Sequence, residues 1–537
     1  MSRSNLDTDV LVVGAGPTGL VLALWLSRMD VRVRVIDKTG ELGTTSRALV
    51  VHARTLEQYD QLGLADTLVD RGLKMAAANI WVAGRKAARV PFGDMGAGVS
   101  AFPYALIYPQ DEHERLLTEH LRAAGVEVER RTELVRFDAG GDRIHAILRR
   151  YDGAEEACES AYLAGCDGAH SRVREVLNTG FPGGTYAHLF YVADVEASGP
   201  VMDRELHVAL DAADFLAVFP LKAPRRARLI GTVRQSSIET HRELAWDDVS
   251  KSIVERMRIS VERVNWFSTY HVHHRVASAF REGRAFLLGD AAHIHSPVGG
   301  QGMNTGIGDA INLAWKLAEV LQGAADPTLL DSFQPERIAF ARRLVATTDR
   351  AFTFVTRDGS LARFMRLYVV PRVLPAAFAL PVFRRLMFRT ISQTAINYRD
   401  GSLSEGVAGQ VQGGDRLPWI ALDSASGQRR DNFTPLTALD WQVHIYGEPA
   451  SDLVRLCNER HLSLHRFDWH PEMQRVGLAR DALYLVRPDG YVALADRSAT
   501  AARLRSYLDA RNLRPRARYQ SSAPKGPAHP AGVSNPV

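Results

Sequence analysis

Cysteine is scarce in this chain, which has only three among its 537 residues. An odd, dispersed set without a Cys-x-x-Cys pair provides neither a disulfide framework nor a zinc site. We therefore expect no metal and a reducing, cytoplasmic location. Long hydrophobic runs are scarce as well. Val10 to Leu26 carries no charge, but three glycines and a proline interrupt it and no second span follows. We expect no stable membrane insertion.

A large excess of charge of one sign is also lacking. The 66 basic residues barely exceed the 61 acidic ones, and no stripe of basic and aromatic residues marks a nucleic-acid surface. We expect no nucleic acid as a partner. With 46% hydrophobic and 24% charged residues, the composition is typical of a globular protein. The length is too great for one ordinary core and predicts two or three domains.

A nucleotide-binding pattern opens the chain. A buried strand over Val10 to Val13 leads into a glycine-rich turn and a helix, and a second strand ends at Asp37 and Lys38. The glycines permit a tight turn, close approach of the backbone to a pyrophosphate, and close helix packing. The residues of the turn are Gly14, Ala15, Gly16, Pro17, Thr18 and Gly19. A glycine-rich turn alone is weak evidence, but here the pattern predicts a dinucleotide site. Asp37 favours FAD or NAD over NADP, because it would repel a 2′-phosphate.

Two later motifs decide between FAD and NAD. The first contains Asp167-Gly168, followed by Ser171 and two arginines. The second begins at Gly289-Asp290 and continues through Pro297, Gly300, Gly302, Met303 and Asn304. Taken alone, Asp167-Gly168 is an ordinary turn, and Asp290 could simply cap the following segment. Together with the first motif, they resemble the class A flavoprotein monooxygenases, which are built like p-hydroxybenzoate hydroxylase. The resemblance covers about residues 7 to 400.

This resemblance implies bound FAD, with NADPH or NADH as a transient co-substrate and O2 as the oxidant. Asp290 would bind the ribityl chain, and the Gly300–Asn304 turn would lie against the flavin pyrimidine edge. Asp167 belongs to the motif that contacts the pyrophosphate region and, in this family, NAD(P)H. Arg47 and Gln110 stand where the family places further FAD contacts, although a surface role is the alternative for each. The implied reaction is hydroxylation of a phenolic or other electron-rich aromatic substrate through a flavin C4a-hydroperoxide.

The predicted fold class is α/β, with a Rossmann-like FAD-binding domain, an inserted antiparallel sheet for the substrate, and a C-terminal α/β domain. The C-terminal unit resembles the thioredoxin-like extension of longer family members, through Gly414–Pro418 and Leu485–Tyr491. Cys457 stands alone there, so we expect a redox-inert domain with a role in packing or in forming a homo-oligomer. The predicted segments are 1–177 with 276–345 (FAD), 178–275 (substrate sheet), 346–400 (linking helices), 401–515 (thioredoxin-like) and 516–537 (disordered tail).

The substrate pocket is expected between the inserted sheet and the flavin. Its candidates are His52, Phe215, Phe219 and Arg234, each with a core or surface role as the alternative. The Arg-rich, aromatic stretch from Asp349 to Arg399 predicts helices that link two domains, with contact to a membrane surface as the alternative. Competing functions are a Baeyer–Villiger-type or epoxidising monooxygenase acting on a polyketide, and a flavin-binding module without turnover. A halogenase is disfavoured because Trp-x-Trp-x-x-Pro is missing. The sequence assigns no general base and names no substrate.

Overall fold

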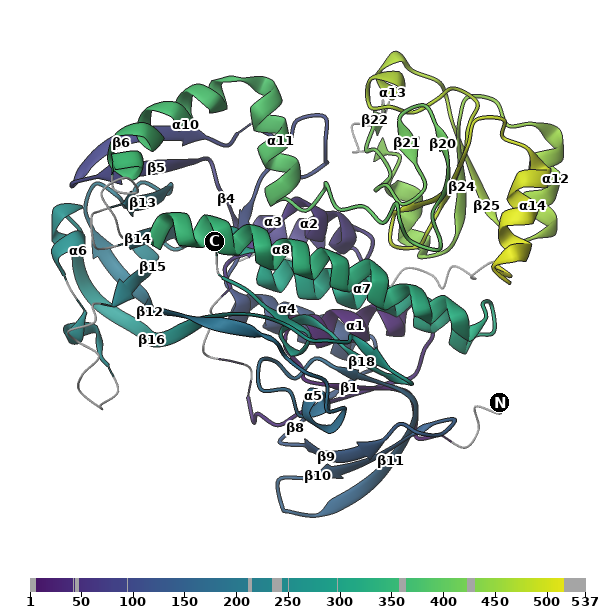
Figure 1. The fold of residues 1–537 in the computed structure, drawn as a ribbon, viewed down its shortest axis with the longest axis horizontal. Coiled ribbons are helices and arrows are strands. Elements are labelled where there is room, and N and C mark those ends of the chain that lie inside the picture. Colours follow the sequence, from purple (N-terminus) through teal and green to yellow (C-terminus); the bar gives the residue numbers. More distant parts are fainter. Residues whose placement is uncertain are drawn as a thin grey trace, which may run out of the picture.

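The computed structural model describes residues 6–41, 43, 48–93, 95–210, 215–233, 244–249, 251–296, 298–356, 364–422 and 430–515. Two eight-stranded sheets and one six-stranded sheet dominate this part of the chain. The six-stranded sheet forms a separate C-terminal unit, while long helices run between the other two sheets (Figure 1). The predicted α/β class is confirmed.

The first sheet is the nucleotide-binding one. Its main path runs β17-β18-β11-β1-β2-β8, and β1 pairs in parallel with β2 and β11. Every residue of β1 is buried, as expected of a strand covered on both faces. The bounds are β1 (Thr8–Val13), β2 (Val33–Asp37), β8 (Val128–Arg130), β9 (Glu133–Asp138), β10 (Ile144–Arg149), β11 (Glu155–Gly165), β17 (Arg281–Glu282) and β18 (Ala285–Leu287). This sheet confirms the Rossmann-like domain.

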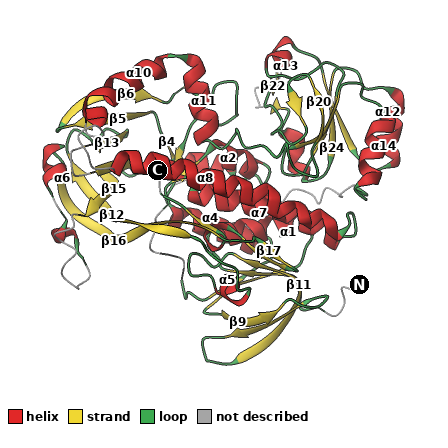
Figure 2. Ribbon diagram, viewed as in Figure 1, coloured by secondary structure: helices red, strands yellow, loops and turns green. Residues whose placement is uncertain are grey.

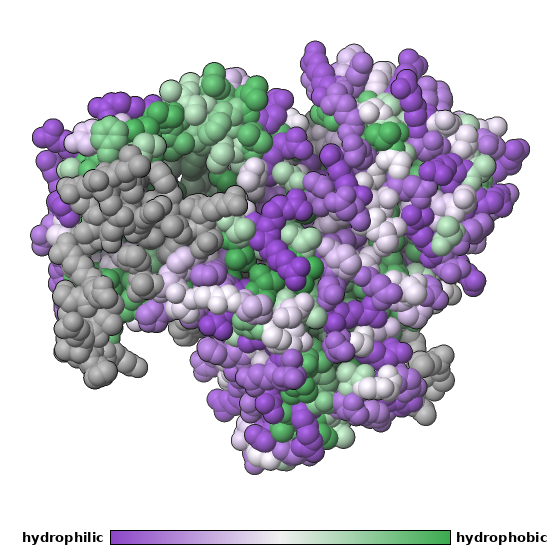
Figure 3. Space-filling view, in the orientation of Figure 1, coloured by the Kyte–Doolittle hydropathy of each residue, from purple (hydrophilic) through white to green (hydrophobic). Residues whose placement is uncertain are grey.

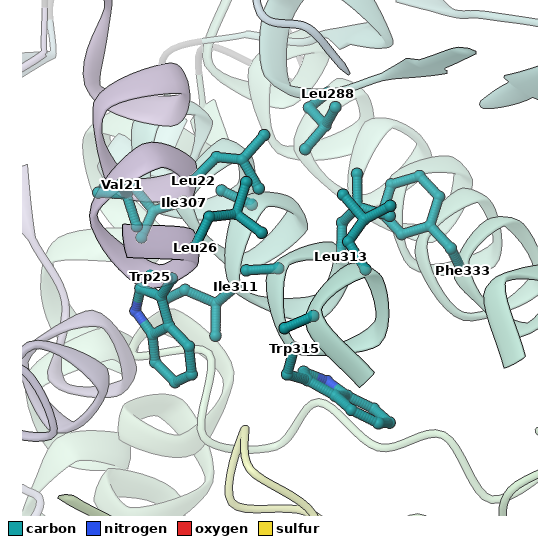
Figure 4. Close-up of a cluster of buried hydrophobic side chains, with 14 of the residues drawn as sticks. Val21, Leu22, Trp25, Leu26, Leu288, Ile307, Ile311, Leu313, Trp315 and Phe333 are labelled. Carbon is teal, nitrogen blue, oxygen red and sulfur yellow. The ribbon is translucent and has the colours of Figure 1, made fainter. Parts of the chain in front are cut away.

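Two helices pack closely over this sheet. Helix α1 (Pro17–Arg28) presents Val21, Leu22, Trp25 and Leu26 toward Ile307 and Ile311 of helix α7 (Gly302–Leu321), as Figure 4 shows. The close approach depends on Gly306, because a Cβ there would collide with the Thr18 hydroxyl and lie 3.1 Å from Cα of Gly289. Helix α4 (Gln110–Ala123) also packs on α1. The nucleotide motifs are thereby attached to a rigid core.

The second sheet is wider than the predicted segment of 178–275. Its order is β19-β16-β12-β15-β14-β13-β5-β6, so β5 and β6 come from earlier in the chain and β19 from later. Strand β5 pairs in parallel with β13, which makes the sheet mixed and not purely antiparallel. The bounds are β5 (Ala77–Val82), β6 (Arg85–Pro91), β12 (Gly183–Ser198), β13 (Leu206–Leu210), β14 (Phe215–Pro220), β15 (Arg226–Val233), β16 (Ser260–Val276) and β19 (His293–Ile294).

The connection between β5 and β6 explains why this hairpin was missed. Ala83 and Gly84 both have positive φ, of 50° and 73°, which is the geometry of a two-residue type I′ turn. Alanine rarely adopts this conformation, so the sequence carries no Asn-Gly or Asp-Gly signal.

Helices occupy most of the described part of 346–400, and the predicted role of this segment in linking two domains stays a prediction. Helix α8 (Phe333–Thr356) runs along the molecule, and α10 (Val370–Ala379) and α11 (Pro381–Ile391) follow at an angle (Figure 2). In the described residues, no single helix is long and apolar enough to cross a membrane. One bent pair in this part of the chain, Leu367–Ala379 with Pro381–Ile391, passes the same length and composition test, and its two parts meet at 102°.

The C-terminal unit has the strand order β21-β20-β27-β26-β24-β25. Its bounds are β20 (Glu405–Ala408), β21 (Val411–Gln412), β24 (Gln442–Tyr446), α12 (Ser451–Glu459), β25 (Ser463–Phe467), α13 (Pro471–Arg475), β26 (Leu483–Val486), β27 (Val492–Asp496) and α14 (Ala501–Ala510). Strands β24 and β25 are parallel with α12 between them, and β26 and β27 are antiparallel. Cys457 is buried without a disulfide partner, and burial raises its pKa to about 11.

A pair of buried tryptophans joins this unit to the nucleotide-binding body. The rings of Trp315 on α7 and Trp441, just before β24, meet edge to face with centroids 5.4 Å apart. We expect Trp441→Ala to lower the free energy of unfolding by about 3–5 kcal/mol, because it opens a large cavity between the bodies. Urea unfolding followed by circular dichroism measures this. Tyr151→Ala, at a side chain that is 78% exposed, is the control and should leave the midpoint unchanged. Equal urea midpoints for both variants would contradict a stabilising role for the Trp315–Trp441 contact.

Candidate functional site

The glycine turn between β1 and α1 divides its glycines between two tasks. Gly14 has φ of 104°, and a Cβ there would collide with the Cys166 carbonyl oxygen; a Cβ at Gly19 would collide with the carbonyl of Gly14. A Cβ at Gly16 would meet no atom within 4 Å. Gly14 and Gly19 therefore close the turn, while Gly16 keeps space open before the N-terminus of α1. Such a terminus offers unpaired N–H groups to phosphates.

Asp37 lies at the end of β2 beside this turn. Its Oδ2 accepts a hydrogen bond from the Ala15 N–H at 2.7 Å, and its Oδ1 accepts from the Thr39 N–H and hydroxyl at 2.8 and 2.6 Å. Arg130, which the sequence analysis missed, lies 3.8 Å from the carboxylate. Its Nη2 is buried and has no hydrogen-bond partner in the described structure. A ligand with acceptor oxygens would satisfy it. Only the register of β2 and β8, which pairs Asp37 with Arg130, reveals this neighbour.

Asp167 organises its own turn. Its Oδ1 accepts from the Ser171 hydroxyl at 2.6 Å and its Oδ2 from the Val173 N–H at 3.1 Å, at the start of α5 (Arg172–Val176). Burial raises its pKa. Arg174 donates to the carbonyls of Ala169 and Ala291, at 2.8 and 2.9 Å. The second motif thus contacts the third, and the expected contact of Asp167 with FAD or NAD(P)H stays a prediction.

The third motif depends on a buried carboxylate in α7. Asp309 accepts from the Gly289 N–H at 3.0 Å, from His293 Nε2 at 2.7 Å and from Arg337 Nε at 2.6 Å. Gly289 has φ of 57°, and a Cβ there would lie 2.7 Å from the Thr18 hydroxyl. The first and third motifs therefore meet at Thr18. Asp290 follows at this turn with an exposed side chain, and its role at the ribityl chain stays a prediction.

The loop before α7 is fixed by Asn304 and His52. Asn304 donates to the carbonyls of Val50 and Gly300, at 2.8 and 2.9 Å, and accepts from the His52 N–H and the Thr55 hydroxyl. His52 Nε2 donates to the Gly299 carbonyl at 2.9 Å, and burial lowers the pKa of this histidine to about 4. Both side chains support the loop from within. The first-turn N–H groups of α7, at Gly302 and Met303, have no intrahelical acceptor and remain available to a ligand.

His295 is a residue of this loop that the sequence analysis did not single out. Its Nδ1 donates to the Ser296 carbonyl at 2.7 Å, so its Nε2 carries a lone pair when the ring is neutral. That atom is buried without a hydrogen-bond partner in the described chain, and a Cβ at Gly302 would lie 3.7 Å from it. Burial lowers its pKa to about 4. The only sequence signal is the second histidine of His293-Ile-His295.

One face of the second sheet carries the expected pocket residues. Phe215 and Phe219 lie four positions apart on β14, so their side chains point to the same side of the sheet. Phe219 packs in a cluster with Val50, whose Cβ would lie 3.0 Å from a Cβ at Gly300. Phe215 belongs to a neighbouring cluster with Phe190 and Tyr270. This aromatic face therefore adjoins the loop before α7 through Phe219.

Polar residues on the same face were missed by the sequence analysis. Arg228 on β15 pairs with Asp194 on β12 through bonds of 2.6 and 2.7 Å. Strand register places Arg228 opposite Phe219 on one side and opposite Asp194 on the other, a relation that only the folded sheet shows. Of the remaining candidates, Gln110 contacts the N–H of Ala48 at 3.2 Å and Lys38 is exposed. Arg47, Pro297 and Arg234 lie outside the described residues. Among the residues that the structure describes, no group of His, Cys, Asp and Glu is placed to hold a metal ion.

The family model for the FAD binding domain matches residues 7–348. The chain belongs to this family. It is 33% identical over 536 residues to 6-methylpretetramide 4-monooxygenase from Streptomyces rimosus, covering 94% of each protein. It is 35% identical over 362 residues to dialkyldecalin synthase from Streptomyces rugosporus, covering 67% of this chain and 74% of that one. The solved structure of the anhydrotetracycline hydroxylase OxyS from Streptomyces rimosus is similar, with a TM-score of 0.77, 27% identity and coverage of 95% and 99%.

The residues present fit FAD. Open space at Gly16 faces the N-terminus of α1, and the buried Nη2 of Arg130 and Nε2 of His295 lack partners among the described residues. The first-turn N–H groups of α7 provide a second positive helix end, suited to an anionic edge. A long, anionic dinucleotide gives a role to four features that the polypeptide alone does not explain.

Gly16 permits a test that separates folding from cofactor binding. Its φ of −75° is open to any residue, so Gly16→Ala should leave the thermal midpoint of the apoprotein unchanged. The added methyl would occupy the space that a pyrophosphate needs, and we expect FAD affinity to fall by about tenfold or more. Fluorescence titration with FAD measures this. Gly141→Ala, at another glycine where an added Cβ would meet no atom within 4 Å, is the matched control. Unchanged affinity in Gly16→Ala would contradict the assigned phosphate position.

Buried neutral histidines make the fold sensitive to acid. Burial lowers the pKa of His52 and His295 to about 4 and that of His113 to about 3. In the unfolded chain each takes up a proton near pH 6.5. Below that pH the unfolded state therefore binds more protons, so stability is fully present above pH 6.5 and falls toward pH 4. Each histidine contributes about 1.4 kcal/mol per pH unit in this window.

We expect the thermal midpoint of the apoprotein to drop steeply between pH 7 and pH 5. His113→Gln should make the decline shallower, because it removes one of the titrating groups and keeps an acceptor for the Tyr59 hydroxyl, which lies 2.8 Å from His113 Nε2. Differential scanning calorimetry at several pH values measures both. A midpoint that stays level between pH 7 and pH 5 would contradict the neutral state of these rings.

Proposed function

We propose that this protein is an FAD-dependent, NAD(P)H- and O2-consuming monooxygenase that hydroxylates an electron-rich, polycyclic phenol. The observation that carries the proposal is the contact of the aromatic sheet face with the loop before α7, through Phe219 and Val50. An aromatic substrate on that face would lie beside the flavin edge. Support for a polycyclic substrate comes from two relatives named for pretetramide and anhydrotetracycline, which match this chain over more than nine tenths of its length.

Different residues of the site would hold different parts of FAD and the substrate. Asp37 and Arg130 would hold the ribose end of FAD, and Gly16 with the α1 N-terminus would hold the pyrophosphate. The first-turn N–H groups of α7 would stabilise negative charge on the flavin pyrimidine. Bound FAD would take electrons from NAD(P)H and activate O2, which supplies the oxygen atom, so the protein needs few reacting groups of its own. The aromatic face of β14 orients the substrate ring and excludes water.

The C-terminal unit is proposed as a redox-inert, thioredoxin-like packing domain. The parallel pair β24 and β25 around α12, followed by the β26–β27 hairpin and α14, supports this. Cys457 is its sole cysteine among the described residues and is buried. Arg416 and Arg487, from the two motifs that suggested the resemblance, donate to Glu57 and Glu336 of the FAD-binding body. The unit thus supports the cofactor domain and takes no part in electron transfer.

A second function is worth testing because one relative is named a synthase and not a monooxygenase. Such a protein would bind FAD without oxidising NAD(P)H in response to substrate. The holoenzyme should be mixed with NADH or NADPH in a stopped-flow instrument, with and without polycyclic phenols. We expect one of them to accelerate flavin reduction, and labelled O2 to place one oxygen atom in the product. If no phenol did either, the monooxygenase proposal would be overturned and the synthase favoured.

The substrate face can be tested with a matched pair of phenylalanines. Phe219→Ala should raise KM for the phenol by about 10- to 100-fold, because burial of a phenylalanine ring against an apolar surface contributes about 1.5–3 kcal/mol. Phe267→Ala removes a ring from the opposite face of the same sheet, where Phe267 stacks on Tyr191. That control should affect thermal stability but leave KM unchanged. Equal effects on KM would place the substrate elsewhere.

A further inference from the structure

The exposed apolar surface of this protein is concentrated on the linking helices. Of eight strongly exposed large hydrophobic side chains in the described ranges, six lie between residues 364 and 386, and each is at least 54% exposed. Figure 3 shows the resulting apolar area at the upper left, over α10 and α11. We call it the helical patch; its apolar members are Phe364, Tyr368, Val373, Leu380, Val382 and Leu386.

The charged residues of the helical patch are all positive. From Gly359 to Arg399 the chain has seven arginines and no acidic residue. Arg372, Arg385 and Arg389 are exposed, and none forms a salt bridge with another residue that the structure describes. On α11, Val382 and Leu386 form one i,i+4 pair and Arg385 and Arg389 another, so the two pairs share one side of the helix. Apolar and cationic groups are therefore presented together.

The opposite side of these helices is fixed to the protein. At the corner between α10 and α11, the rings of Phe378 and Phe383 meet edge to face with centroids 5.2 Å apart. Phe388 is buried against Gly96, where an added Cβ would lie 2.6 Å from its ring carbon Cε1. The helices are thus anchored on one side and bare on the other. The two helices meet at 102°, so their exposed sides extend in two directions across the surface of the protein.

We propose that the helical patch binds the surface of an anionic lipid bilayer, with α10 and α11 lying in the interface. Such a bilayer offers negative headgroups and hydrocarbon side by side. Basic amphipathic helices use both, and long arginine side chains reach the headgroups while aliphatic ones enter the acyl boundary. The contact is peripheral and needs no membrane-spanning helix. It is independent of the substrate proposed above.

Two other occupants, a second copy and the C-terminal residues of the same chain, lack the complementary charge. A two-fold contact with a second copy would place the same arginine-rich patch of both subunits in one interface, with no acidic residue from that stretch to balance the charge. Residues 516–537 of the same chain contain Arg516, Arg518 and Lys525 but no acidic residue, so they offer no counter-charge. An acidic protein would meet the charge requirement, and the experiment below distinguishes it from lipid.

The test is flotation of the FAD-loaded, full-length protein with two kinds of vesicle. One contains phosphatidylcholine alone, and the other contains phosphatidylcholine and phosphatidylglycerol in equal parts. We expect binding to the mixed vesicles only, weakening as salt is raised. Arg385→Gln with Arg389→Gln should lower the partition coefficient roughly 30-fold, at about a factor of five per arginine. Val382→Glu with Leu386→Glu should abolish binding.

Matched controls are available on other surfaces. Tyr151→Glu with Val407→Glu changes two large hydrophobic side chains that are 78% and 54% exposed, close to the 81% and 60% of Val382 and Leu386. Arg122→Gln with Arg475→Gln removes two exposed arginines. Both control pairs should bind vesicles as the unchanged protein does, and all variants should retain FAD. The proposal is overturned if no vesicle binds, as an acidic protein partner would predict, or if both vesicle types bind equally. It is also overturned if ultracentrifugation shows a dimer that the patch substitutions dissociate.

Discussion

One buried carboxylate, that of Asp309, supports the geometry of the cofactor site. It is fully buried, and three donors from three separate segments converge on it: the Gly289 N–H, His293 and Arg337. Desolvation alone would raise its pKa, but the Arg337 guanidinium and His293 outweigh this and hold the pKa low. A buried charge with such partners is costly to disturb, since removing one member leaves the others unpaired. The Gly289 turn, the loop of His293 and helix α8 are therefore held to α7 together.

Helices α7 and α8 also connect the cofactor site to the C-terminal unit. Arg337 also donates to the Tyr398 hydroxyl at 2.8 Å. Further along α7, Lys316 donates to Glu336, which in turn accepts two bonds from Arg487 of the C-terminal unit. Burial lowers the pKa of Lys316 to about 8, and the neighbouring cations outweigh burial and hold the pKa of Glu336 at about 2. Buried ion pairs contribute less to stability than apolar contacts of similar size, but these pairs require their partners at hydrogen-bond distance and so restrict the orientation of the unit.

Local sequence patterns predicted the parts of the site that depend on backbone conformation. Gly14 needs positive φ and Gly16 needs open space, and both requirements are visible in the order strand, glycine turn, helix. Arg130 and His295 could not be found in this way. Arg130 comes beside Asp37 through strand pairing over 93 positions, and the significance of His295 lies in a buried nitrogen without a partner among the described residues. Pairing and burial are properties of the folded chain, and no short motif encodes them.

The sequence by itself determined the cofactor, because three motifs in a fixed order each impose backbone geometry that few residue types allow. It also determined the α/β class and the separate C-terminal unit, through runs of buried strand and helix. Only the tertiary structure decided the extent of the second sheet, where β5 joins β13 across more than a hundred residues. It also decided which face of β14 meets the loop before α7, and that His52 and Asn304 hold that loop. The physical reason is that a side chain's role depends on what it touches once buried, and contacts between distant segments are fixed by packing and not by local conformation.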